Sequence, residues 1–266
     1  MIAPAGRPQA DSPPRAPLFA SASRVSLDAD AVHIWRVDLD AVEPRFGELL
    51  DQHERARAER IVRQPARRRW IAARGVLRAL LGGYLEQDPS ALPLTREERG
   101  KPVLDPSGGS GLHFNLSHSG PLAVYALTEM CAVGVDVELV ARRMGAAGRP
   151  DEVALAQRVL GGATAERLRK LEPRARRLDF LRAWVRHEAE GKRLGVGVGN
   201  TPMQARARSS RPWIAELDLG RDAVGAVALA TAPVDFQVYA IDFRAGGSIL
   251  PACANTTYED EPNVSK

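Results

Sequence analysis

The sequence contains few of the residues that mark several large classes of protein. Only 2 of its 266 residues are cysteine, too few for a disulfide framework or a cysteine-rich metal cluster. No apolar run approaches the roughly eighteen residues that a membrane-spanning helix needs. Aromatic residues make up 5% of the chain and do not interleave with arginines as in a base-stacking surface. These absences predict a cytoplasmic protein with reduced thiols and with neither a membrane nor a nucleic acid as its partner.

Lysine is also scarce, although the chain is basic. The 37 basic and 33 acidic residues give a net charge of +4, the pI is near 9.4, and nearly all of the basic residues are arginine. The four lysines are Lys101, Lys170, Lys192 and Lys266. Arginine suits phosphate because its planar fork donates two parallel hydrogen bonds. A lysine inside a motif is nevertheless more informative here than one arginine among many.

What the chain does have is one pattern that occurs twice. Each copy predicts a strand, an arginine-rich helical segment and a hairpin, at 31–40, 49–85 and 112–128 and again at 132–140, 153–195 and 213–231. This order predicts an α+β fold of two similar lobes, related by internal duplication and a pseudo-twofold axis, with a ligand cleft between them. We expect a disordered leader at 1–27, lobes at 28–129 and 130–244, and a loose tail at 245–266.

The second predicted strand, AVGVDVELV, carries two carboxylates two residues apart. Asp136 and Glu138 face the same side of a strand, and the alternating valines face the core. Two carboxylates on one side suit a hard divalent cation such as Mg²⁺, but they also suit a solvated strand face. Asp38 and Asp40 have the same spacing in the first copy, so the spacing alone does not decide between these interpretations.

The helical segment AWVRHEAEGKRLG places Glu188 and Lys192 four residues apart, on one helix face. The pair is either a surface ion pair or a functional pair, with Glu188 as a metal ligand or proton acceptor and Lys192 aimed at phosphate. The glycines at 195, 197 and 199 end the helix and allow the backbone to approach a ligand.

The hairpin motif FNLSHSG contains Ser117, His118 and Ser119 at a strand end. His118 suits contact with a base or a phosphate, or it has no function beyond the hairpin. His113 lies five residues earlier and faces the other way, which argues against a paired-histidine metal site. Neither serine lies in a nucleophile elbow, so a serine hydrolase triad is not indicated.

Four motifs, in this order, resemble those of the 4′-phosphopantetheinyl transferases. They are GKP at 100–102, FNLSHS at 114–119, VGVDVE at 133–138 and WVRHEAEGK at 184–192. They match the long, internally duplicated class that activates carriers of peptide synthetases and polyketide synthases, and the resemblance runs from about Val32 to Phe243. It implies that coenzyme A donates its phosphopantetheine arm to a serine of an apo acyl or peptidyl carrier protein, leaving 3′,5′-ADP.

The resemblance also implies residue roles. Asp136, Glu138 and Glu188 would hold Mg²⁺. Glu188, directly or through a water on the metal, would help to remove the serine proton, and Lys192 would steady or protonate the leaving phosphate. The residues implied to contact coenzyme A are Arg69, Arg74, Lys101, Ser117 and His118. The duplicated halves further suggest a monomer.

Two features depart from this family's pattern or extend it. His187 stands where the family commonly has lysine, which predicts a pH dependence of the local charge. The insertion 144–152 is expected to be a mobile loop near the carrier site. Two rival interpretations are another divalent-metal enzyme, such as a nuclease or nucleotide hydrolase, and an inactive arginine-rich binding module.

Overall fold

The computed structural model describes residues 26–97, 100–105, 109–141, 151–196, 212–243 and 248–251. Its first half contains β1 (Ala31–Asp38), the 3₁₀ helix η1 (Pro44–Leu49), α1 (Gln52–Glu59), α2 (Gln64–Leu85), β2 (Leu94–Arg96), β3 (Pro102–Leu104), β4 (His113–Ser119) and β5 (Leu122–Thr128). The second half contains β6 (Gly134–Leu139), α3 (Glu152–Val159), α4 (Gly162–Arg169), α5 (Pro173–Arg193), β7 (Trp213–Leu217), β8 (Ala223–Leu229), β9 (Asp235–Asp242) and β10 (Ser248–Pro251). The fold is α+β, as the sequence predicts.

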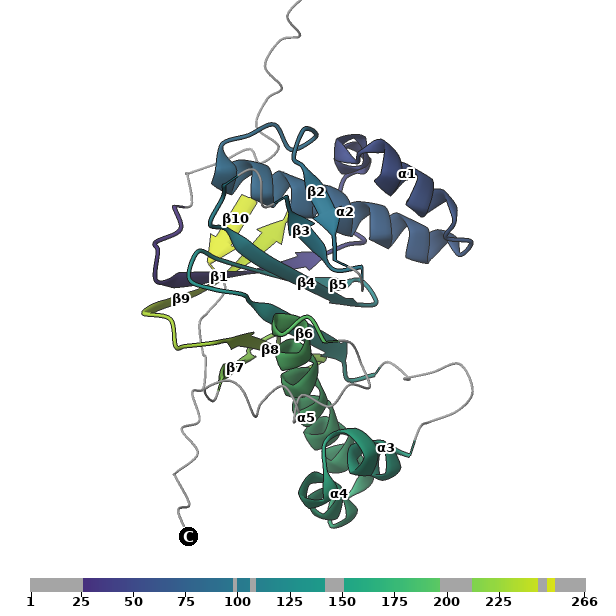
Figure 1. The fold of residues 1–266 in the computed structure, drawn as a ribbon. Coiled ribbons are helices and arrows are strands. Elements are labelled where there is room, and N and C mark those ends of the chain that lie inside the picture. The colour runs from purple at the N-terminus through teal and green to yellow at the C-terminus, as the bar shows by residue number, and fades with distance from the viewer. Residues whose placement is uncertain are drawn as a thin grey trace, which may run out of the picture.

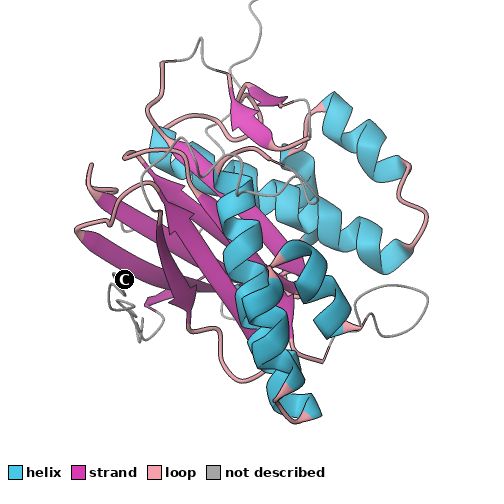
Figure 2. Cartoon of the chain, turned by 60° about the horizontal axis from the view of Figure 1, so that its bottom comes forward, coloured by secondary structure: helices cyan, strands magenta, loops and turns pink. Residues whose placement is uncertain are grey.

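The described elements form two main sheets between two groups of helices. The larger sheet has the strand order β10-β9-β1-β5-β4, and the smaller has the order β6-β8-β7. Figure 1 shows α1 and α2 on the side of the larger sheet and α5 on the side of the smaller one. Figure 2 shows the long helices lying outside the strands.

Three apolar clusters hold these layers together. One joins α2 and η1 to the larger sheet through residues such as Trp35, Leu77 and Tyr125. The second fills the space between the sheets, where Ile34 and Val124 meet Val135. The third packs α5 against the smaller sheet. The valines that alternate with the carboxylates of β6 therefore do face a core, as the sequence predicts.

The two halves repeat one strand topology. In the first, β1 pairs antiparallel with β5, which pairs with β4. In the second, β6 pairs antiparallel with β8, which pairs with β7. Each half thus has a strand, a helical segment and a hairpin whose second strand pairs with the first strand. This is the arrangement that an internal duplication predicts.

Two C-terminal strands differ from the sequence expectation. β9 lies in the range predicted for the second lobe, but it pairs in parallel with β1 and extends the larger sheet. β10 lies in the segment expected to be a loose tail, but it pairs antiparallel with β9. The pairing of β9 with β1 joins residues far apart in sequence, so local periodicity gives no sign of it. β10, in contrast, pairs with the strand that directly precedes it along the chain.

The predicted helical segments are each divided into shorter helices. α1 begins at a capping box in which Asp51 and Glu54 satisfy each other's backbone amides. Pro65 and Pro173 lie in the first turns of α2 and α5, where proline costs no hydrogen bond. Among the described helices, none has both the length and the apolar content for a membrane crossing. Most of the predicted mobile insertion at 144–152, namely residues 144–150, lies outside the described residues.

Candidate active site

The edges of the two sheets meet where β4 lies beside β6, and side chains of β4 form hydrogen bonds across this boundary. Asn115 accepts a hydrogen bond from the Val135 amide at 3.0 Å. Ser119 donates to Glu138 at 2.7 Å and accepts from the Leu139 amide at 3.1 Å. Alternate residues of FNLSHS thus fix the position of β6, the strand that carries the candidate metal ligands.

Asp136 lies at the centre of this boundary and is 6% exposed. Its Oδ1 accepts hydrogen bonds from Ser117 Oγ at 2.8 Å and from Lys192 Nζ at 2.7 Å. Lys192 also donates to the Val135 carbonyl at 3.0 Å. The Oδ2 atom of Asp136 is buried and has no hydrogen-bond partner among the described residues. A buried carboxylate oxygen of this kind is costly unless a further ligand satisfies it.

The helix α5 brings Glu188 close to these carboxylates. Gly134 makes the close approach possible, because a Cβ on this residue would lie 2.0 Å from the Ala189 carbonyl oxygen. Burial raises the pKa of Glu188, and the negative charges of Asp136 and Glu138 raise it further. The three predicted carboxylates, from two distant segments, are therefore close enough to interact electrostatically.

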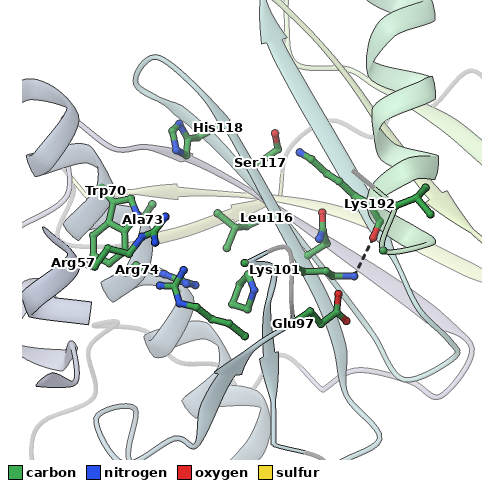
Figure 3. Close-up of a pocket in the computed structure, with 16 residues that line it drawn as sticks. Arg57, Trp70, Ala73, Arg74, Glu97, Lys101, Leu116, Ser117, His118 and Lys192 are labelled. Carbon is green, nitrogen blue, oxygen red and sulfur yellow. Dashed lines mark hydrogen bonds between the residues drawn. The ribbon is translucent and has the colours of Figure 1, made fainter. Parts of the chain in front are cut away.

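Lys101 connects the first half of the chain to the end of α5. Its Nζ donates to the backbone carbonyl of Lys192 at 3.1 Å, in the last turn of the helix, where a cation is favourable (Figure 3). Burial lowers the pKa of Lys101, and the charge of Lys192 adds to this effect. The GKP motif thus contributes a half-buried cation next to the candidate site.

A pocket of about 430 Å³ opens beside this cluster. Figure 3 shows Lys101 and Lys192 on one side of it and Arg57, Trp70 and Arg74 on the other. It is lined by Arg57, Trp70, Ala73, Arg74, Arg96, Glu97, Gly100, Lys101, Pro102, Asn115, Leu116, Ser117, His118, Lys192, Gly195 and Val196.

One part of the pocket gathers three arginines. Burial lowers the pKa of Arg74 to about 10, and the charges of Arg96 and Arg57 act in the same direction. The guanidinium of Arg74 lies 5.7 Å from the centre of the Trp70 ring, and its Nη1 is buried without a hydrogen-bond partner in the described part of the chain. Mutually repelling cations with an unsatisfied donor form a site that favours an anion with several charges.

The structure brings most of the predicted site residues together. Those that line the pocket are Arg74, Lys101, Ser117, His118 and Lys192. Asp136, Glu138 and Glu188 are not lining residues. Two lining residues, Ser117 and Lys192, connect Asp136 to the pocket by hydrogen bonds.

Arg69, which the resemblance implies to contact coenzyme A, is paired with a carboxylate outside the pocket lining. Its Nε and Nη2 donate to the two carboxylate oxygens of Asp40 at 2.8 and 2.6 Å, and it is not a lining residue of the pocket. This bidentate pair lies at the surface, and the Arg69 guanidinium lowers the pKa of Asp40. Asp40, one of the two carboxylates with this spacing in the first copy, thus has an arginine partner.

The donor chemistry fits a hard divalent ion, although the described side chains do not form a closed metal site. Asp136, Glu138 and Glu188 supply the carboxylate oxygens that Mg²⁺ prefers. The Oδ2 of Asp136 is buried and has no hydrogen-bond partner among the described residues, so this oxygen can accept a ligand. Among the described residues, however, no group of three or more histidine, cysteine, aspartate or glutamate side chains is arranged around one ion.

Sequence reasoning missed several residues of this site. Asn115, and the role of Ser119 as a partner of Glu138, were detectable in principle, because polar residues alternate along β4. Arg57 and Arg96 gave no comparable signal, since arginines are common throughout the chain. Only the fold brings them into the pocket beside Arg74.

Comparison with known proteins gives a consistent result. Residues 42–130 match the family model described as 4′-phosphopantetheinyl transferase, N-terminal. The chain is 36% identical over 222 residues to the 4′-phosphopantetheinyl transferase HetI of Nostoc sp., which covers 77% of this chain and 90% of that protein. It is 30% identical over 187 residues to a phosphopantetheinyl transferase of Thraustochytrium sp., which covers 64% of this chain and 62% of that protein.

Proposed function

The chain belongs to the 4′-phosphopantetheinyl transferase family, and from this premise we propose that it transfers the 4′-phosphopantetheine arm of coenzyme A to a serine of an apo acyl or peptidyl carrier protein. The observation that carries the proposal is the boundary between β4 and β6. There, three interacting carboxylates and Lys192 lie next to a pocket lined with arginine, lysine and histidine side chains. Such a site combines cations for phosphate groups with a carboxylate for proton removal.

The proposed reaction is one phosphoryl transfer. The oxygen of the carrier serine attacks the phosphorus nearer to pantetheine, and a new phosphorus–oxygen bond forms to the serine. The bond from this phosphorus to the bridging oxygen breaks, and 3′,5′-ADP leaves with that oxygen. The proton of the serine hydroxyl passes to a base of the enzyme. In such reactions a protein acts mainly by positioning the reactants and neutralising charge.

Glu188 is the proposed base. Burial and the nearby carboxylates raise its pKa, and a carboxylate of raised pKa is a stronger proton acceptor when ionised. Lys192 is the proposed stabiliser of the leaving phosphate, because it lines the pocket and its ammonium donates to Asp136. Hydrogen bonds to Asp136 and to the Val135 carbonyl hold this ammonium in place.

Asp136, Glu138 and Glu188 are the residues that would hold Mg²⁺. The ion, when bound, would supply positive charge to the pyrophosphate oxygens. Ser117 and Ser119 orient two of these carboxylates by donating hydrogen bonds to them. Hydrogen bonds of this kind fix the direction of metal ligands.

The pocket cations are the proposed contacts of coenzyme A. Arg74, Lys101 and His118 line the same cavity, and a guanidinium can bind phosphate through two parallel hydrogen bonds. We also propose that one chain suffices for activity, because both halves of the pocket come from the same chain. The scarcity of cysteine supports the further proposal that the protein works in the cytoplasm.

The test is a panel of purified apo carriers from fatty acid, polyketide and peptide synthesis, each incubated with enzyme, coenzyme A and Mg²⁺. Intact mass measurement should show one added phosphopantetheine on at least one carrier, and 3′,5′-ADP should appear in equal amount. Reactions without coenzyme A, or with an alanine at the carrier serine, serve as controls. Absence of mass gain on every carrier, with enzyme that binds coenzyme A, would contradict the proposed reaction.

A further inference from the structure

A buried carboxylate outside the pocket, Glu54 of α1, contacts two arginines of α2. It is 4% exposed, and its Oε2 accepts a hydrogen bond from Arg78 Nε at 2.6 Å. Its Oε1 lies 3.6 Å from Arg74 Nε. One negative charge is thus shared between a fully buried arginine and an arginine of the pocket wall.

The two arginines differ in how well they are satisfied. Arg78 also forms an ion pair with Asp51 at 2.5 Å and donates to the Pro89 carbonyl at 3.0 Å. Arg74 has the longer contact to Glu54, and its Nη1 is buried without a partner in the described part of the chain. Among the described residues, the network therefore gives Arg78 several hydrogen-bond acceptors and leaves Nη1 of Arg74 without one.

Glu54 is also the negative charge that offsets the repulsion between Arg74 and the neighbouring arginines. Burial lowers the pKa of Arg74 to about 10, and Glu54 acts against this change. The charges of Arg96, Arg78 and Arg57 lower the pKa further. A guanidinium at this position would otherwise be driven from its like-charged neighbours towards solvent.

We infer that Glu54 is a positioning residue for ligand binding: it holds the guanidinium of Arg74 at the pocket wall so that the unsatisfied donor meets an anionic oxygen of the ligand. This inference rests on the proposed function for the identity of the ligand, coenzyme A. Glu54 itself does not line the pocket, and it reaches the pocket through its contact with Arg74.

A positioning role and a simple electrostatic effect of Glu54 predict opposite changes in the affinity for the anionic ligand. Removal of a carboxylate near an anion site should strengthen anion binding if charge alone mattered. Removal of a positioning residue should weaken binding, because Arg74 then loses its preferred orientation. The variant Glu54→Gln separates the two, since it removes the charge and nearly preserves the shape.

The experiment measures the dissociation constant of coenzyme A by calorimetry, without carrier, for the full chain and its variants. Glu54→Gln should raise the constant about tenfold, within the range of coupling between residues in contact. Asp51→Asn is the matched control, since it also removes a carboxylate from Arg78 and retains a good helix cap, while the ion pair of Arg74 is with Glu54. It should change the constant by less than about twofold.

A double variant tests whether the effect passes through Arg74. In the background of Arg74→Met, Glu54→Gln should cause no further loss of affinity, because its target is gone. Michaelis constants provide a second readout: the constant for coenzyme A should rise in Glu54→Gln, while that for the carrier should not. Should Glu54→Gln fail to fold, Glu54→Asp retains the charge, moves it by one methylene and should still weaken binding.

The outcomes separate this inference from the proposed function. If the unmodified protein binds no coenzyme A, the proposed function is wrong. If it binds coenzyme A and Glu54→Gln binds as tightly or more tightly, the positioning role of Glu54 is wrong. An additive loss in the double variant would equally overturn the role, because Glu54 would then act independently of Arg74.

Discussion

The two halves of the chain have the same strand topology, and each contains an aspartate paired with a cation of its long helical segment. In the first half, Asp40 pairs with Arg69, and the aspartate side chain is 42% exposed. In the second half, Asp136 pairs with Lys192, and the aspartate side chain is 8% exposed. The same kind of pair is a surface feature in one half and a buried feature in the other.

This difference shows what burial adds to a recurring pattern. An exposed ion pair contributes at most about 1 kcal/mol, because water screens both charges. A buried pair must offset the loss of hydration, and the Asp136 pair does so with hydrogen bonds from Ser117 and Lys192. Buried charge is costly to keep, so its presence beside a pocket indicates a functional role.

The halves also differ in the charge that they bring to the site. The first half contributes the cations Arg57, Arg74, Arg96, Lys101 and His118, the last as a potential one. The second half contributes the carboxylates of β6 and α5, with Lys192. We therefore expect changes in the second half to affect mainly the chemical step, and changes in the first half to affect mainly ligand binding.

The largest effect is expected for Glu188→Gln. Loss of the proposed base should lower the transfer rate by on the order of a thousandfold, within the range for general base catalysis. The affinity for coenzyme A without added metal should stay nearly unchanged. Single-turnover transfer to an apo carrier and calorimetry measure the two quantities. Asp40→Asn, the control in the first half, should transfer normally; equal losses in both variants would remove the distinction between the halves.

Lys192→Met should have the next largest effect, and it should act on both rate and stability. We expect about a hundredfold slower transfer, as for loss of one donor to a developing negative charge. The unfolding free energy in urea should fall by about 2 kcal/mol, because the buried charge of Asp136 loses its cation.

The combination of Lys192→Met with Asp136→Asn distinguishes these two effects. Stability should partly return in the double variant, since neither charge is then buried without a partner. Transfer should remain slow, because the cation near the leaving phosphate is still missing. The 2.7 Å contact between Lys192 and Asp136 indicates that their charges are coupled, and additive losses of stability in the double variant would contradict this coupling.

His118→Ala tests the first half of the comparison. His118 lines the pocket, so its loss should raise the dissociation constant of coenzyme A about tenfold, or roughly 1.4 kcal/mol, while kcat changes little. His113→Ala is the control on the same strand, since this residue is not a lining residue. An unchanged affinity in His118→Ala would show that His118 has no binding role, whatever its effect on rate.

The sequence predicted the parts of this molecule that depend on local patterns. Alternation placed the valines of β6 in the core and Asp136 and Glu138 on the opposite face. Helical spacing placed Glu188 and Lys192 on one side of α5, near those carboxylates. Both follow from the repeat of a single strand or helix.

The parts that were missed depend on contacts between distant segments. The pairing of β9 with β1 and the position of Arg57 in the pocket leave no periodic signal in the sequence. In the sequence, Glu54 looks like an ordinary residue of a helix N-terminus, and Arg78 looks like one more arginine among many. Their roles depend on burial, which the pattern of one short segment does not fix.

The smallest effect is expected for Arg69→Met, although the sequence predicts that Arg69 contacts the nucleotide. Its guanidinium already donates hydrogen bonds to both carboxylate oxygens of Asp40, and Arg69 does not line the pocket. We expect the affinity for coenzyme A to change less than about twofold, and stability by about 0.5 kcal/mol, because the pair is exposed. Arg74→Met, five residues further along the same helix, should weaken binding at least about tenfold, since Arg74 lines the pocket. Calorimetry on the two variants compares them directly. A large loss in Arg69→Met would mean that the ligand draws Arg69 away from Asp40, and the surface pair of the first half would then have a binding role after all.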